Sequence, residues 1–254
     1  MMKLYKLTTT ICLILACLIF GNQLIAQDKN DNALFFNIKY GIQFPGGDLA
    51  DRFGTHFTAG IDPELYLANG HWFLGLQGNF IFGSDVKENV LAGIQTSEEQ
   101  IIGNDMLFAE VIMRQRGLNF GGHVGKLFAF NSENNHTHGL RLTMGAGLIM
   151  HRIAFKDDRN SALQLRGDYA KGYNRKAVGA YTHQFIGYQF LSADRRLNFR
   201  AGFVFHQGFT SSVRSTDFDT KMKEEGNRLD LMNGFEVGWI LPIFFTKRET
   251  RFYF

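Results

Sequence analysis

Beyond residue 26 the chain lacks cysteine, has only three prolines and contains no long uninterrupted apolar run. Both cysteines, Cys12 and Cys17, lie in the first 26 residues, so the remainder cannot form a disulfide or a cysteine-ligated metal site. No later stretch reaches the roughly 18 to 20 apolar residues that a membrane-spanning helix requires. Thiol redox chemistry and helical membrane bundles are therefore excluded for this part.

Residues 1–26 have the features of a secretory signal peptide. Lys3 and Lys6 form a positive start, residues 11–20 form an apolar stretch, and the segment ends in Leu-Ile-Ala, a cleavage motif. Removing these two lysines from the 27 basic residues leaves 25 against 24 acidic ones, a net charge of +1. We therefore expect a single exported domain over 27–254 with no overall charge that would attract nucleic acid.

Glycine and phenylalanine are abundant, at 28 and 26 residues, and apolar side chains recur at every second position. This period places them on one face of a strand. One face of each segment is apolar, and the other combines glycine with a few polar or charged residues. The pattern is weaker in 176–190, where Val178, Ala180, Ile186 and Tyr188 form the apolar side. The clear segments are 34–44, 57–67, 72–82, 140–150, 199–209 and 231–243.

The length of these faces separates two all-β architectures. A soluble sandwich also alternates, but its strands are about 5 to 6 residues long and its outer face is rich in polar residues. The faces here extend over about 10 to 12 residues, or roughly 33 to 40 Å, which suits a tilted strand that crosses an apolar band of about 25 Å. The pattern favours an antiparallel transmembrane β-barrel.

The connections between the segments fall into two length classes. Short ones lie at 68–70, 131–137 and 191–195, and longer ones lie at 45–54, 84–104, 154–175 and 210–229. The two classes alternate, as in outer-membrane barrels, if residues 105–130 form one strand, and this gives eight strands. Charged residues in 105–130 then share a face with apolar ones, so we expect a bulge near Gly117. The alternative divides 105–130, adds a strand within 84–104 and gives ten strands.

An eight-stranded barrel has room inside only for side chains or one small ligand. The polar face supplies five cations and four anions, whose near balance suits a poorly hydrated interior. We interpret them as a structural ion network, because no catalytic or metal-binding motif is present and no cofactor is implied. The residues are Lys39, Asp62, Glu64, Glu110, Arg114, Arg116, Arg141, Arg200 and Glu236.

Two long connections carry candidate contact residues. The segment 84–104 is unusually apolar, which predicts that it folds over the barrel mouth or docks a partner. The segment 154–176 has a local excess of positive charge that could contact lipopolysaccharide phosphates or an acidic partner. Its basic residues are Lys156, Arg159, Arg166, Lys171, Arg175 and Lys176.

The last alternating segment resembles the signal by which the barrel-assembly machinery recognises a final strand. The pattern places Glu236, Gly238, Leu241 and Ile243 in the polar, glycine and apolar positions, and the chain ends in Phe254.

With this segment and the stretches 167–173, 184–188 and 207–210, the chain resembles small outer-membrane barrel proteins of Bacteroidota. Members of that group serve type IX secretion, gliding or nutrient capture at the cell surface. The resemblance implies residence in a lipopolysaccharide-containing outer membrane.

Three functions are compatible with this pattern. The leading hypothesis is a non-enzymatic barrel whose wall or loops bind other envelope proteins, as an accessory or structural subunit of a secretion or surface-assembly complex. The second is a small channel, which needs ten strands or a wetter lumen. The third is a barrel-embedded lipid-modifying enzyme, which needs a nucleophile and a base near the outer rim.

Overall fold

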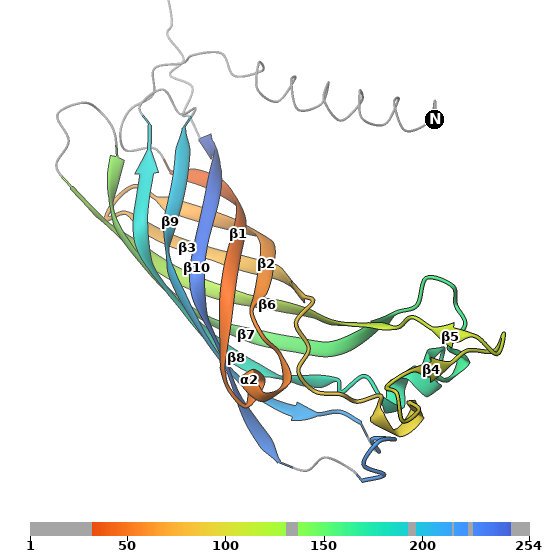
Figure 1. Cartoon of the computed structure of the whole chain (residues 1–254). Coiled ribbons are helices and arrows are strands. Elements are labelled where there is room, and N and C mark those ends of the chain that lie inside the picture. Colours follow the sequence, from red (N-terminus) through yellow and green to blue (C-terminus); the bar gives the residue numbers. More distant parts are fainter. Residues whose placement is uncertain (1–31, 131–136, 193–196, 215, 223–225, 245–254) are drawn as a thin grey trace, which may run out of the picture.

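A computed structural model of the chain describes residues 32–130, 137–192, 197–214, 216–222 and 226–244. Eight long strands form a closed antiparallel barrel in the order β1-β10-β9-β8-β7-β6-β3-β2, with β10 paired to β1 (Figure 1). The predicted eight-stranded transmembrane barrel is therefore confirmed. The strands are β1 (Ala33–Gly47), β2 (His56–Leu67), β3 (Trp72–Gly83), β6 (Ile112–Ala129), β7 (Thr137–Lys156), β8 (Ala177–Leu191), β9 (Asn198–Ser212) and β10 (Asn227–Phe244).

The alternating pattern decides which side chains leave the barrel. On β7, Leu140, Met144 and Leu148 are exposed, whereas Arg141 and Thr143 between them are buried. The outward apolar positions of β7 extend from residue 140 to residue 150, about 33 Å of strand. At a tilt of about 40° this length spans the apolar band of about 25 Å that barrels present to lipid. Among the described residues, no helix is long and apolar enough to cross a membrane.

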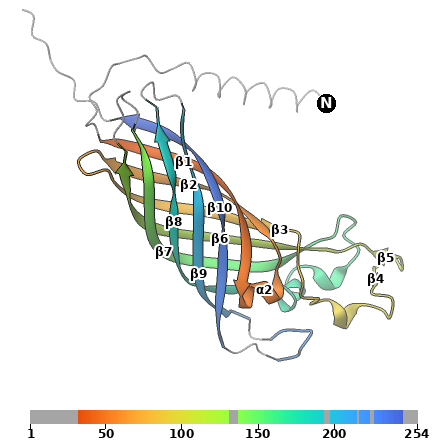
Figure 2. The same ribbon diagram turned by 60° about the vertical axis from the view of Figure 1, so that its left-hand side comes forward.

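The turn at 68–70 lies at one end of the barrel, and the connections that follow β1, β3 and β7 lie at the other (Figure 2). The β6–β7 ladder is continuous from the pair Ile112–Lys156 to the pair Ala129–Gly139. Gly117 pairs in register with Ile81 on one side and His151 on the other. The expected bulge near Gly117 and the ten-strand alternative are therefore both wrong, and residues before Ile112 belong to the outer connection.

The long connections fold together over the outer end. They contain α2 (Asp48–Arg52), the short sheet of β4 (Ile101–Ile102) and β5 (Phe108–Ala109), and the 3₁₀ turns η1 (Ala92–Ile94), η2 (Leu163–Leu165) and η3 (Tyr169–Gly172). Side chains from three connections bury one another, so the apolar segment 84–104 covers the barrel mouth, the first of the two outcomes that its composition predicted. We call this unit the outer cap; its buried apolar members include Leu49, Phe53, Val90, Leu91, Ile101, Ala162 and Leu165, and Ile149, Ile153 and Tyr181 of the strands pack against them.

Candidate functional site

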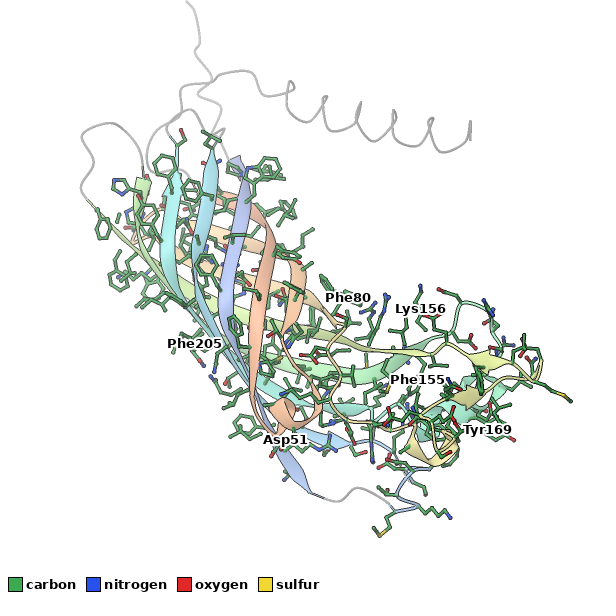
Figure 3. The ribbon with its side chains drawn as sticks, viewed as in Figure 1. Asp51, Phe80, Phe155, Lys156, Tyr169 and Phe205 are labelled. Atoms are coloured by element: carbon green, nitrogen blue, oxygen red, sulfur yellow. The ribbon has the colours of Figure 1, made fainter. Side chains whose placement is uncertain are left out.

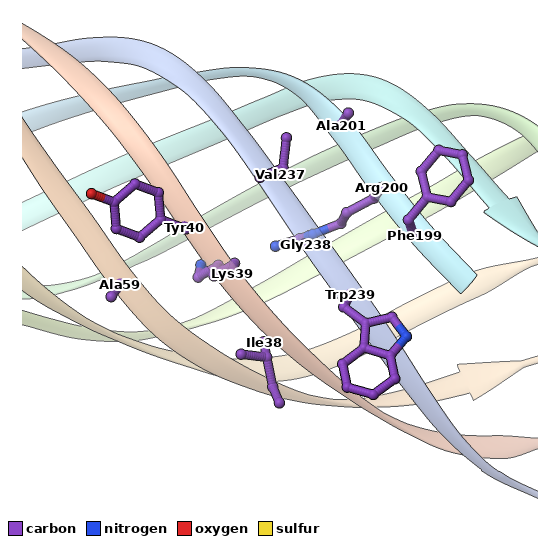
Figure 4. A pocket seen from close by; sticks show the side chains of 10 residues that line it. All are labelled: Ile38, Lys39, Tyr40, Ala59, Phe199, Arg200, Ala201, Val237, Gly238 and Trp239. Atoms are coloured by element: carbon purple, nitrogen blue, oxygen red, sulfur yellow. The ribbon is translucent and has the colours of Figure 1, made fainter. Parts of the chain in front are cut away.

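A buried ion network crosses the middle of the lumen. Lys39 Nζ lies 2.9 Å from Asp62 Oδ2 and 3.6 Å from Glu236 Oε2. Arg200 Nη2 lies 2.8 Å from a carboxylate oxygen of each of the same two acids. A Cβ atom added at Gly238 would lie 3.2 Å from Arg200 Nε, so glycine at this position leaves room for the guanidinium (Figure 4).

A second cluster surrounds Glu64, which is fully buried. Its Oε1 atom accepts hydrogen bonds from Arg141 Nη2 at 2.5 Å and His123 Nε2 at 2.9 Å. Arg200 Nη1 lies 3.9 Å from the same oxygen and so connects the two clusters. Arg141 also donates to Gln189 Oε1 at 2.7 Å. The guanidinium of Arg141 is therefore held from two sides.

The combined network ties all eight barrel strands together. Within the described lumen it contains three fixed cations and three carboxylates, and close pairing of this kind offsets the desolvation cost of burying charge. Polar side chains missed by the sequence analysis complete it: Gln77 Nε2 donates to Tyr181 Oη at 2.6 Å and lies 3.0 Å from His183 Nδ1. The sequence could have revealed them, because these polar residues alternate with the apolar residues that face outward on the same strands.

Apolar layers close the lumen on both sides of the network. At the end with the short turns, Phe35, Phe73, Leu127 and Ile240 are buried inside the barrel, and the Arg141 guanidinium carbon lies 4.2 Å from the centre of the Phe73 ring. At the other end lies the outer cap. Because a hydrated ion would have to displace both the apolar layers and the paired charges, this arrangement is unsuited to conduction.

The structure brings together six of the nine residues predicted for the lumen, namely Lys39, Asp62, Glu64, Arg141, Arg200 and Glu236. The assignment of the other three was wrong. Glu110 is exposed in the connection before β6. Arg114 and Arg116 share the outward face with Leu118, because the β6 register is continuous. Both arginines lie on the outer side of the Leu118–Met150 pair, the last apolar outward pair of the β6–β7 hairpin before the arginines.

A barrel-embedded hydrolase would need a hydroxyl nucleophile in contact with a histidine base. Within the described residues, the buried His151 does not form this pair. Its Nε2 atom lies 2.8 Å from Asp230 Oδ2, and the Thr210 hydroxyl donates to the same oxygen at 2.5 Å. The carboxylate thus separates the hydroxyl from the imidazole that would have to act as its base. No group of three or more His, Cys, Asp or Glu side chains in this part of the chain could hold a metal ion.

A second ion cluster fastens the outer cap. Arg175 Nε lies 2.9 Å from Glu88 Oε1, its Nη2 lies 2.7 Å from Asp219 Oδ2, and its Nη1 pairs with Asp217. Arg52 lies 3.0 Å from the same glutamate and donates to the Arg175 carbonyl oxygen at 2.9 Å. The prediction that Arg175 is available for an external contact is wrong, because three acids from two other connections hold it.

The remaining basic residues of this connection differ in exposure. Lys156, Arg159, Arg166 and Lys171 are exposed, and Lys176 is half-buried. Lys171 pairs with Asp168, and this hydrogen bond and charge lower the pKa of the Asp168 carboxyl. An exposed pair of this kind contributes little to stability.

One patch of the lipid-facing wall is polar. Thr182 and Gln184 on β8 and Gln207 on β9 point outward at positions where most other strands carry apolar residues. The two carboxamides exchange hydrogen bonds of 3.0 Å in both directions, and the Thr182 hydroxyl donates to Gln207 Oε1 at 2.7 Å. Thr182 and Gln184 pair with Ala146 and Met144 in the middle of the β7 band. We call these three residues the wall patch.

The predicted final strand is β10, which closes the barrel. Glu236 and Gly238 face the lumen, whereas Leu241 and Ile243 face outward. Phe254 and the predicted signal peptide at 1–26 lie outside the described residues.

Comparison with known proteins finds no matching family model and no matching curated protein. Among solved structures the chain is similar to Ail, the attachment invasion locus protein of Yersinia pestis, with 9% identity over 83% of this chain and 99% of that one and a TM-score of 0.37. Neisserial surface protein A (NspA) matches with 10% identity, coverage of 82% and 96% and a TM-score of 0.41. The N-terminal β-barrel domain of Pseudomonas aeruginosa OprF matches with 12% identity, coverage of 83% and 98% and a TM-score of 0.35.

Proposed function

We propose that this chain is a non-enzymatic barrel of the outer membrane that docks through its lipid-facing wall onto another membrane-embedded envelope protein. It serves there as an accessory or structural subunit of a secretion or surface-assembly complex. Residues 1–26 direct export, and the barrel-assembly machinery recognises β10 through Glu236, Gly238, Leu241 and Ile243. The sealed lumen supports a role without conduction.

The observation that carries this proposal is the wall patch. Each carboxamide has two N–H donors, and the bonds between Gln184 and Gln207 use one from each. Within the described residues the second donor of each amide has no acceptor. An unsatisfied amide N–H that faces hydrocarbon costs free energy that a hydrogen-bonding partner at the same depth would recover.

The neighbouring residues favour close approach of a partner. Ala146 on β7 and Ala180 on β8 flank Thr182 on the outward face, and neither has a side chain that would hold a second backbone away. Small residues beside hydrogen-bonding side chains are the combination by which membrane segments associate. The occupant we infer is therefore a transmembrane protein segment with its own hydrogen-bonding side chains.

Site-specific photocross-linking in intact cell membranes tests this assignment. A photoreactive residue at Gln184 is compared with one at Ile61, an exposed outward position on β2 at the opposite side of the ring. We expect a discrete adduct with another envelope protein from position 184 and none from position 61. No adduct from either position, or equal adducts from both, would contradict the proposal. An adduct between two copies of this chain would also contradict the proposal, because it would show that the wall patch is the contact of a homo-oligomer.

Loss of the contact in a folded variant provides the second test. Replacing both glutamines of the wall patch by leucine removes the hydrogen-bonding groups but retains a lipid-compatible surface. The folded band on a heat-modifiability gel should remain while the adduct, probed from Thr182, disappears. A persistent adduct would show that the patch does not make the contact.

A further inference from the structure

The outward face of β6 and β7 changes character at one row of the sheet. Leu118 pairs with Met150, and both belong to the apolar band. The next outward pair toward the outer end is Arg116 with Arg152. Arg114 and Lys156 continue the same outward face beyond this pair. We call these four cations the rim cluster; Figure 3 shows Lys156 on the outer extension of this hairpin.

Among the described residues, the fold pairs only one of these four cations with a carboxylate. Arg116 donates to the carbonyl oxygen of Gln115 at 2.9 Å, and its guanidinium carbon lies 5.9 Å from the centre of the Phe80 ring. Lys156 pairs with the exposed Asp158 at 2.8 Å. Within the described residues, no carboxylate forms an ion pair with Arg114, Arg116 or Arg152, and the buried Nε atom of Arg114 has no hydrogen-bond partner.

Like charges directly opposite each other on neighbouring strands destabilise a sheet. Arg116 and Arg152 occupy such a pair, so the unliganded hairpin carries a repulsion that a bound anion would relieve. Guanidinium groups are suited to this role, since they bind phosphate through paired N–H donors.

The depth of the cluster indicates the source of the anion. Arg152 lies one outward position beyond the end of the apolar band, where a membrane has its headgroups. Directly below it Leu118, Leu148 and Phe80 are exposed and form an apolar surface on which acyl chains could lie. A ligand with phosphates above and acyl chains below fits both parts of the surface.

We propose that the rim cluster binds the phosphate groups of an acylated glycolipid of the outer leaflet. The side chains of Arg114, Arg116, Arg152 and Lys156 contact the phosphates, and the acyl chains lie along the band below. This site does not depend on the wall patch, which faces outward from β8 and β9. Failure of the cross-linking test would leave the glycolipid site unaffected.

Native mass spectrometry of the folded full chain in detergent tests the proposal, with bisphosphorylated lipid A as the probe. The variant Arg116→Gln/Arg152→Gln removes two charges, and Arg159→Gln/Lys171→Gln is the matched control with the same charge loss in the outer loops. At roughly fivefold for each cation near a membrane surface, binding should weaken about 25-fold in the first variant and remain unchanged in the control. If lipid A binding weakened equally in both variants, the loss would be explained by overall charge alone, and the proposed site would be wrong.

Two further arms separate the ligand chemistry from nonspecific adhesion. Lipid A without phosphates should bind the wild-type chain as weakly as bisphosphorylated lipid A binds Arg116→Gln/Arg152→Gln. Inorganic phosphate at the same concentration should not displace bisphosphorylated lipid A from the wild-type chain. Without lipid, Arg152→Gln should raise the melting temperature on a heat-modifiability gel, because the repulsion between Arg116 and Arg152 is removed. Addition of lipid A should raise the melting temperature of the wild type by more than that of the variant. Competition by inorganic phosphate, or a lower melting temperature of lipid-free Arg152→Gln, would contradict the proposal.

Discussion

Removal of Arg200 tests the lumen network most severely. Arg200 lies 2.8 Å from both Asp62 and Glu236, so Arg200→Met leaves these two carboxylates with Lys39 as their nearest cation. The described network then has three carboxylates and two fixed cations. Breaking a buried ion pair from one side typically costs about 3 to 5 kcal/mol. We expect a destabilisation of this size.

The compensating variant distinguishes charge imbalance from lost packing. Arg200→Met/Glu236→Gln restores two carboxylates against two cations, with Lys39 near Asp62 and Arg141 near Glu64. It should recover most of the stability lost by the single variant. Urea unfolding in detergent micelles, followed by the fluorescence of Trp72 and Trp239, measures both. At about 2 kcal/mol per M of urea, the single variant should shift the midpoint down by roughly 2 M. A single variant that costs less than about 1 kcal/mol, or a double variant as unstable as the single, would refute the reasoning.

Three other predictions concern separate parts of the molecule. A Cβ atom at Gly147 would lie 2.1 Å from the Phe120 carbonyl oxygen, whereas a Cβ atom at Gly122 would have its nearest neighbour 3.8 Å away. Gly147→Val should therefore abolish the folded band on a heat-modifiability gel, and Gly122→Val should retain it. Leu91→Asp puts a charge into the outer cap, and limited proteolysis should cut the outer connections faster while the barrel core stays protected; unchanged proteolysis would mean that the cap does not depend on this core. Burial and the charge of Lys126 lower the pKa of His71 below its usual value of 6.5, so NMR titration should find a depressed pKa that rises in Lys126→Gln. Because the folded state resists protonation, the stability contribution of His71 is present above pH 6.5 and is lost as the pH falls below it, and a normal pKa for His71 would contradict this.

The sequence predicts the barrel well because a membrane imposes a strict two-residue period on every strand. Leu140, Met144 and Leu148 must face lipid, so Arg141 and Thr143, at the alternate positions, must face the lumen. The number of strands was also predictable, since short and long connections must alternate. Parity and loop length are local properties, and both can be determined without tertiary information.

Two of the wrong assignments, those of Arg114 and Arg116, arise where a strand continues beyond the membrane. Arg114 and Arg116 share parity with Leu118, and the prediction moved them inward because an outward charge is costly in lipid. Their strand leaves the apolar band before it reaches them, which removes that cost. Arg175 was treated as a free loop cation because its partners, among them Glu88 and Asp217, are distant in sequence.

The weak alternation of 176–190 had a structural meaning that the sequence alone did not supply. Thr182 and Gln184 interrupt the apolar side of this segment, and Gln207 interrupts the next strand. Strand register was needed to show that the interruptions meet in one patch.

Lipid exposure of the barrel wall is the central claim, and spin-label accessibility measures it directly. In a chain with Cys12 and Cys17 replaced by serine, single cysteines at Ile61, Leu74 and Met144 carry labels on three strands, and a label at the exposed loop residue Met222 serves as the aqueous reference. In lipid bilayers the three wall labels should relax with oxygen and be shielded from a water-soluble nickel chelate, whereas the Met222 label should respond to the chelate. Chelate access at the wall positions equal to that at Met222 would contradict the account.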